Sequence, residues 1–160
     1  MNFLYNIYIE KRKERKVTMG LDMYLMSANR EEAKSWKNLK ANEKTCAMDQ
    51  DPWCEVGYWR KANQIRNWFV NNCNYPEDGN CEKVEVTKEN LEKLMNTCRE
   101  VLANHDLAEK LLPSSRGFFF GSYDYDEWYF LQLEDTIRIC EDVILDTDWE
   151  KEEVIYTDWW

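Results

Sequence analysis

The sequence of 160 residues predicts an α+β fold in which three main helices pack with a small sheet formed by an N-terminal and a C-terminal strand. Two observations predict this class. Apolar residues recur at helical spacing in long segments, and short alternating or aromatic segments stand near both ends of the chain. A chain of this length corresponds to one domain, and we expect a single globular domain over residues 19–160.

Alternation and aromatic content predict the strands. Leu21, Met23 and Leu25 alternate with other residues, which is the period of a strand with one buried face. The aromatic segment 153–160 is expected to pair with 20–26 and to bring both ends of the domain into one sheet. The strands are expected at 20–26, 82–86 and 153–160.

Apolar stripes predict the helices. The first of the three main helices is expected from a stripe at i, i+4, i+7 and i+11, formed by Tyr58, Ala62, Ile65 and Phe69. Thr87 is expected to be the N-cap of the second main helix. Three main helices are expected at 55–73, 87–104 and 126–146, with short helical pieces at 30–39 and 107–112.

Composition excludes several classes of protein. The chain has 21 Lys and Arg against 31 Asp and Glu, a formal net charge of −10, which argues against a general binder of duplex nucleic acid. Hydrophobic residues make up 44%, with eight Trp, which is ample for a core. No apolar run approaches the roughly 20 residues that span a bilayer, so we expect no membrane partner.

Residues 1–18 are open to two interpretations. An apolar stretch precedes the basic run 11–16, which is the reverse of the order in a signal peptide. The segment is therefore either an extension upstream of a start at Met19 or an N-terminal tail that belongs to the protein.

Cysteine and histidine spacing gives no metal motif. The six Cys residues form no C-x-x-C pair, and His105 is the single histidine. We expect free thiols, with Cys98 and Cys140 as core residues; a disulfide between Cys73 and Cys81 is the alternative. A solvated position at a helix end is expected for His105, and no metal or cofactor is expected.

Two segments carry the candidate ligand-binding residues. Winding 55–69 as a helix places Arg60, Asn63 and Asn67 on one side, although a solvated polar face is the more common reason for such a group on a single helix. The segment 111–122 combines two glycines, three serines and an arginine but is not a P-loop; its Phe118 and Phe120 are expected to fill the core. The predicted ligand-binding residues are Tyr58, Trp59, Arg60, Asn63, Asn67, Arg116, Ser122 and Tyr123.

Acidic residues open the third predicted helix. Asp124, Asp126 and Glu127 stand where the helix macrodipole favours negative charge, which accounts for them structurally. A metal site or an acid/base pair is the alternative for the same residues.

The motif set resembles a family of small bacteriophage and prophage proteins of unassigned function. The resemblance covers about 19–144 and rests on the segments 19–25, 55–65, 111–113, 117–122 and 125–129. It implies a phage context and favours Met19 as the start, because members of that family begin Met-Gly-Leu-Asp-Met-Tyr. The sequence departs from the family at Arg66, where His is expected, and this weakens an enzymatic interpretation.

Three functional hypotheses follow. The first is a small-molecule binder in the cytoplasm of the infected host, which sequesters a nucleotide-derived immune signal without turnover by stacking on aromatic rings and pairing with Arg. A homodimer is compatible with such a binder. The second is an acidic inhibitor that binds a host defence protein. The third is a nucleotide-cleaving enzyme that uses Asp124, Asp126 and Glu127.

Overall fold

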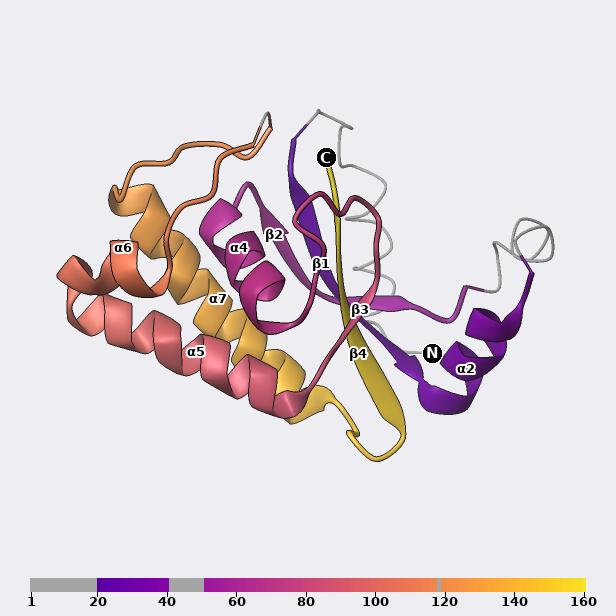
Figure 1. The fold of residues 1–160 in the computed structure, drawn as a ribbon. Coiled ribbons are helices and arrows are strands. Elements are labelled where there is room, and N and C mark those ends of the chain that lie inside the picture. Colours follow the sequence, from indigo (N-terminus) through magenta and orange to yellow (C-terminus); the bar gives the residue numbers. More distant parts are fainter. Residues whose placement is uncertain (1–19, 41–50, 118) are drawn as a thin grey trace, which may run out of the picture.

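A four-stranded antiparallel sheet forms the centre of the computed structural model, which describes residues 20–40, 51–117 and 119–160. The strand order is β2-β1-β4-β3. The strands are β1 (Asp22–Asn29), β2 (Cys54–Arg60), β3 (Val84–Val86) and β4 (Glu152–Trp159). Figure 1 shows β1 and β4 crossing the middle of the molecule. The predicted pairing of 20–26 with 153–160 is confirmed, as is a strand within 82–86.

The register of β1 and β4 sorts their residues between the two faces of the sheet. Pairing runs from Asp22 opposite Trp159 to Asn29 opposite Glu152. Leu21, Met23 and Leu25 are fully buried, as the alternation predicts. Because Met23 lies opposite Asp158, that carboxylate is on the same buried face.

Helices cover that face of the sheet. The helices α4 (Asn63–Asn72), α5 (Lys88–Ala103) and α7 (Glu127–Asp146) lie together on one side in Figure 1. The helix α2 (Arg30–Asn38) packs on the opposite face, where Ala33 meets Ala28, Trp53 and Ile155. A 3-10 turn at His105–Leu107 leads into α6 (Ala108–Leu111).

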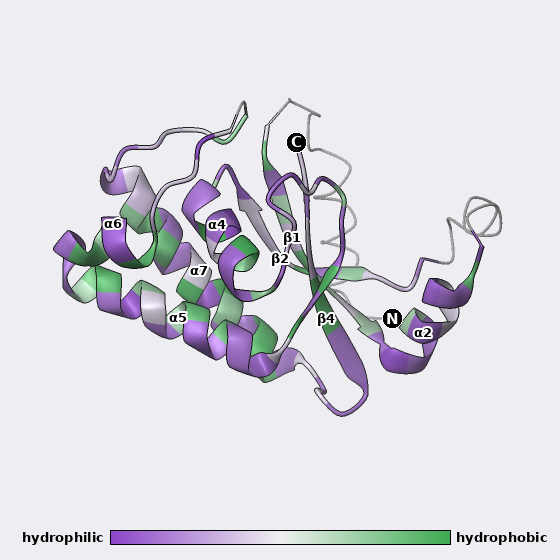
Figure 2. Cartoon of the chain, viewed as in Figure 1, coloured by the Kyte–Doolittle hydropathy of each residue, from purple (hydrophilic) through white to green (hydrophobic). Residues whose placement is uncertain are grey.

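The predicted number of three main helices needs correction, because the described residues contain five α-helices beside the four strands. Both short helical pieces are present, at Arg30–Asn38 and at 105–111. Figure 2 shows the hydrophobic residues of α5 and α7 concentrated between the two helices and toward the sheet. Within the described part of the chain, no helix combines the length and apolar character needed to cross a membrane.

The prediction of a helix over residues 55–73 is wrong for residues 55–60. Residues Cys54–Arg60 form the strand β2, and α4 begins at Asn63 after Lys61, whose backbone has a φ of 56°. Pairing with β1 determines this outcome, since aromatic and β-branched residues fit a pleated surface when a partner strand is available. Gly57 also fits the strand: a Cβ there would lie 2.6 Å from Cγ2 of Ile139 on α7.

The helices α5 and α7 begin and pack as predicted. Thr87 caps α5 through a capping box with Asn90, and the Asp126 side chain accepts a hydrogen bond from the backbone N–H of Tyr129 at 3.0 Å. Cys98 and Cys140 are completely buried between the two helices and the core. Both are free thiols, and so are Cys54, Cys73 and Cys81; Cys46 lies outside the described residues.

We expect the free energy of unfolding to fall as the pH rises above about 9. Burial raises the pKa of Cys140 to about 12 and raises that of Cys98 further above its ordinary value of 9.0. Above pH 9.0 the two thiols therefore lose their protons in the unfolded chain and keep them in the folded protein. Each thiol then lowers the free energy of unfolding by about 1.4 kcal/mol per pH unit, which urea unfolding at about pH 8 and pH 10 measures.

The matched control is the double variant Cys98→Ala/Cys140→Ala. Its free energy of unfolding should decline less over the same interval. An equal decline in the variant and the wild type would show that other groups cause the alkaline loss.

Candidate functional site

Three segments converge at the end of the sheet where β2 and β4 finish. These are the loop 112–126, the loop 73–83 after α4, and Trp160 after β4. The backbone N–H of Leu21 bonds to the carbonyl of Phe119 at 3.2 Å, and that of Cys81 bonds to the carbonyl of Asp158 at 2.7 Å. They enclose a pocket of about 520 Å³, here called the Arg66 pocket, which is lined by Arg66, Ser115, Arg116, Gly117, Phe120 and Trp160, with Glu77 and Asp78.

Arg66 is the buried cation of this pocket. The helix α4 carries its side chain into the core, where 2% of the residue is exposed. Nε donates to Asp158 Oδ2 at 2.8 Å, and Nη2 donates to the carbonyls of Glu77 and Gly79, both at 3.0 Å. The third nitrogen, Nη1, has no hydrogen-bond partner within the described ranges. The guanidinium also lies 4.9 Å from the ring centre of Phe120.

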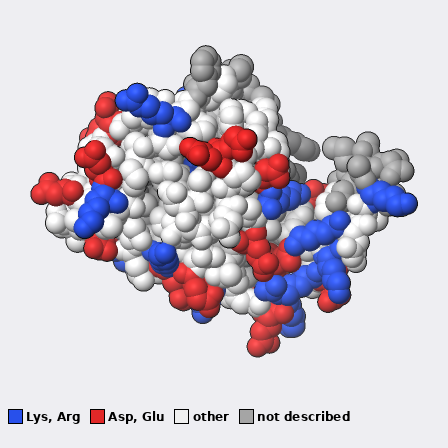
Figure 3. Space-filling model, in the orientation of Figure 1, with Lys and Arg blue, Asp and Glu red and all other residues white. Residues whose placement is uncertain are grey.

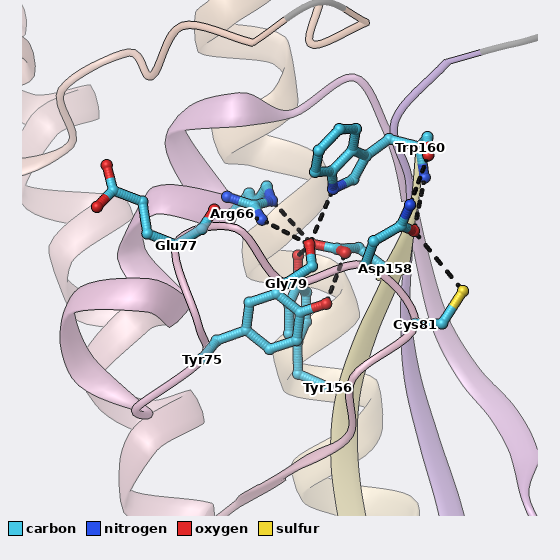
Figure 4. A network of polar contacts seen from close by, with 9 residues as sticks. Arg66, Tyr75, Glu77, Gly79, Cys81, Tyr156, Asp158 and Trp160 are labelled. Atoms are coloured by element: carbon cyan, nitrogen blue, oxygen red, sulfur yellow. Dashed lines mark hydrogen bonds and ion pairs between the residues drawn. The ribbon is translucent and has the colours of Figure 1, made fainter.

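Asp158 provides the charge that balances Arg66. Its carboxylate accepts hydrogen bonds from the hydroxyls of Tyr75 at 2.6 Å and Tyr156 at 3.1 Å. Figure 4 shows Arg66, Tyr75 and Trp160 gathered around Asp158 and Gly79. Burial raises the pKa of Asp158, and the hydroxyl hydrogen bonds and the Arg66 charge oppose that rise. The ion pair thus belongs to a buried polar network in which Nη1 of Arg66 is the nitrogen left without a partner among the described residues.

Asn63 fastens the loop 112–126 to α4. This buried side chain donates to the carbonyls of Phe120 at 3.0 Å and Ser122 at 2.8 Å, and accepts from the backbone N–H of Ser115 at 2.9 Å. Asn67 adds a bond to the carbonyl of Pro113 at 3.2 Å. Both asparagines, which are predicted to contact a ligand, hold the loop that carries Arg116.

Arg116 and Tyr123 lie together on the outer side of this loop. The Arg116 guanidinium is 5.9 Å from the centre of the Tyr123 ring, and the Tyr123 hydroxyl donates to the Gly117 carbonyl at 2.9 Å. Arg116 is exposed, and no acidic side chain in the described segments forms an ion pair with it. Phe120 fills the core as predicted, whereas Phe118 lies outside the described residues.

Ser122 belongs to a different feature. Its hydroxyl accepts a hydrogen bond from the backbone N–H of Asp124 at 3.2 Å, and the residue lines a small cavity of about 60 Å³ beside Lys61 and Asp126. Ser122 is therefore near Arg116 along the chain but does not line the Arg66 pocket.

Tyr58, Trp59 and Arg60 line a second pocket, of about 410 Å³, between β2 and α7. The predicted face that joined Arg60 to Asn63 and Asn67 does not exist, because Arg60 is in the strand and the asparagines are on α4. The Trp59 ring is buried and its Nε1 donates to Thr136 at 2.9 Å, so the ring faces the core.

The cations of this second pocket have acidic partners. Arg60 lies 3.5 Å from Asp22, and Arg138 pairs with Asp135. The Tyr58 hydroxyl donates to Asp22, and burial together with that carboxylate raises the pKa of Tyr58 to about 12. Both arginines of the second pocket therefore have an acidic partner, whereas Arg116 has none among the described residues.

Comparisons with protein-family models, curated proteins and solved structures find no match. The site must therefore be interpreted from its own chemistry.

The acidic residues 124–127 serve the start of α7, where Asp126 is the N-cap. In the parts of the chain that are described, no group of three or more His, Cys, Asp or Glu residues could hold a metal ion. His105 is exposed at the end of α5 as predicted, and its ring stacks on Phe130 with a centroid distance of 3.7 Å.

Arg66 is the residue that the sequence interpretation missed. The sequence distinguishes it only as a departure from the phage family that the chain resembles, and it favours Arg60 as the site residue. A signal exists in the sequence: Arg66 is the single charged residue of α4, and Asp158 follows the apolar residues 154–156 of β4. Opposite charges on two otherwise buried elements indicate an internal ion pair.

Proposed function

We propose that the protein binds a nucleotide-derived small molecule in the Arg66 pocket and retains it without turnover. Following the resemblance to phage proteins, the ligand would be an immune signal of the bacterial host, sequestered in the cytoplasm of the infected cell. The observation that carries the proposal is the convergence of buried Arg66, exposed Arg116 and the Trp160 ring on one pocket.

The dimensions and chemistry of the pocket support a ligand of this size. A volume of about 520 Å³ falls within the range of roughly 300–1,000 Å³ that small-molecule sites occupy. Trp160 is partly exposed, and its indole is fixed by a bond from Nε1 to the Gly79 carbonyl at 2.9 Å. Fixed aromatic rings and arginines are the groups that hold bases and phosphates.

Native mass spectrometry of the full chain with a panel of ribonucleotides tests the proposal. We expect a complex that releases the intact nucleotide on denaturation, and its mass also reports whether the protein is a homodimer. Arg116→Gln should weaken binding by about tenfold, since a charge-assisted hydrogen bond contributes about 1.5–3 kcal/mol.

Arg138→Gln provides the matched control. It removes an exposed arginine that lines the second pocket and should leave nucleotide binding unchanged. The proposal fails if no nucleotide is retained at millimolar concentration, or if the released molecule is a cleavage product.

A second candidate is an inhibitor that binds a host defence protein. The observation that favours it is a set of exposed aromatic residues at the start of α7: Tyr123, Tyr125 and Trp128, the last 61% exposed. On the face shown in Figure 3, acidic and basic groups are interspersed, which differs from the continuous acidic surface of a nucleic-acid mimic. Capture of a host protein by the wild type and not by Trp128→Ser would favour this candidate.

A further inference from the structure

We propose that the Arg66 pocket selects an oxo-purine base such as guanine. The base lies inward with its carbonyl edge at Nη1 of Arg66, and the phosphate lies outward at Arg116. This inference rests on the proposed function and names the ligand class and its orientation in that site.

Arg66 lines the Arg66 pocket, and one of its three nitrogens has no hydrogen-bond partner among the described residues. Nε and Nη2 are held by Asp158 and by the carbonyls of Glu77 and Gly79, so Nη1 is the nitrogen left for a ligand. A buried donor without a partner costs free energy until a ligand satisfies it. Arginine nitrogens donate and never accept, so the ligand atom at this position must be an acceptor.

The charges around Arg66 indicate that the ligand atom that accepts a hydrogen bond from Nη1 is neutral. The Arg66 charge is already balanced by Asp158, and the exposed acids Glu77 and Asp78 also line the pocket. A phosphate at the inner end would bring a further negative charge beside Asp158, in a pocket that already has two acidic residues in its lining, and two like charges at about 4 Å repel by about 4 kcal/mol near a protein surface. A base carbonyl accepts the hydrogen bond without that repulsion.

Guanine matches the donors and acceptors of the pocket better than adenine does. Its O6 and N7 atoms form the edge that arginine recognises in nucleic acids, whereas adenine has an amino donor at the same place. Glu77 and Asp78 line the same pocket, and a carboxylate accepts hydrogen bonds from the N1–H and 2-amino groups of guanine. The Trp160 ring beside Arg66 supplies a stacking surface, as Figure 4 shows.

Arg116 fits the phosphate at the outer end. Of the two arginines that line this pocket, Arg116 is the one without an acidic partner in the described structure. Asn63 holds the loop that carries it. An exposed guanidinium can pair with phosphate without the desolvation that a buried ion pair requires. The two arginines thus have separate roles, Arg66 toward the base and Arg116 toward the phosphate.

Calorimetric titration of the full chain with guanosine monophosphate, adenosine monophosphate and inorganic phosphate tests this assignment. We expect the guanine nucleotide to bind at least about tenfold more tightly than the adenine nucleotide, and inorganic phosphate to bind most weakly. Arg66→Lys keeps the positive charge beside Asp158 but removes Nη1, and should reduce the preference for guanine. Arg116→Gln should weaken both nucleotides by the same factor.

The outcomes separate this inference from the proposed function. Binding of neither nucleotide overturns both. Equal affinity for the two nucleotides overturns the inference and leaves the proposed function intact. Phosphate that binds as tightly as the guanine nucleotide, and is lost in Arg66→Lys, reverses the proposed orientation. The wild-type titrations decide the base preference even if Arg66→Lys fails to fold.

Discussion

Replacement of Asp158 by alanine is expected to lower the free energy of unfolding by about 3–5 kcal/mol. The substitution leaves the Arg66 guanidinium buried without its counter-charge, and it removes the acceptor of the Tyr75 and Tyr156 hydroxyls. Urea unfolding followed by tryptophan fluorescence measures the loss, provided that the variant folds.

A second variant keeps this prediction testable. Arg66→Met combined with Asp158→Asn removes both charges and retains an acceptor for the tyrosines, so it should recover part of the lost stability. Glu141→Gln, which breaks the exposed pair with Arg99, is the control and should cost no more than about 0.5 kcal/mol. If Asp158→Ala and Glu141→Gln cost equal amounts, the buried pair does not stabilise the fold as described.

Replacement of Asn63 by alanine is expected to lower the free energy of unfolding by about 3 kcal/mol and to abolish ligand binding. The variant removes three hydrogen bonds and leaves the Phe120 carbonyl and the Ser115 N–H without their partner, at about 1–3 kcal/mol for each unsatisfied buried group. The loop that carries Arg116 would then no longer be fixed to α4. Unfolding and nucleotide titration measure the two effects.

Asn67→Ala is the comparison for this variant. Asn67 makes a single bond to the same loop, to the Pro113 carbonyl, so its loss should cost about 1 kcal/mol and leave nucleotide binding measurable. Equal effects of the two substitutions would show that Asn63 has no special role in fixing the loop.

The sequence predicts those elements whose signals are local. The helices α5 and α7 carry an N-cap and a periodic apolar face within one segment, and β1 alternates clearly, so their positions follow from short-range patterns. Strand β2 lacks such a signal, because its conformation depends on the partner β1, more than twenty residues earlier in the chain. The helical spacing of the apolar residues that begins at Tyr58 matches a helix only by coincidence.

The same distinction applies to the candidate site. Arg116 could be selected because it stands in a glycine-rich and serine-rich loop, which is a local feature. Arg66 could not be selected in this way, because its role depends on Asp158, which lies 92 residues further along the chain. Its aromatic ring makes Trp59 a candidate in the sequence, whereas the strand conformation turns that ring into the core.

The central pairing of β1 with β4 also has a consequence for synthesis in the cell. Strand β1 leaves the ribosome well before its neighbour β4, because more than one hundred residues separate the two strands in the chain. The edge of β1 that pairs with β4 therefore stays unpaired while the residues between the two strands are synthesised. Long-range pairing of this kind slows folding and exposes the nascent chain to aggregation, so we expect chaperones to hold it until β4 emerges.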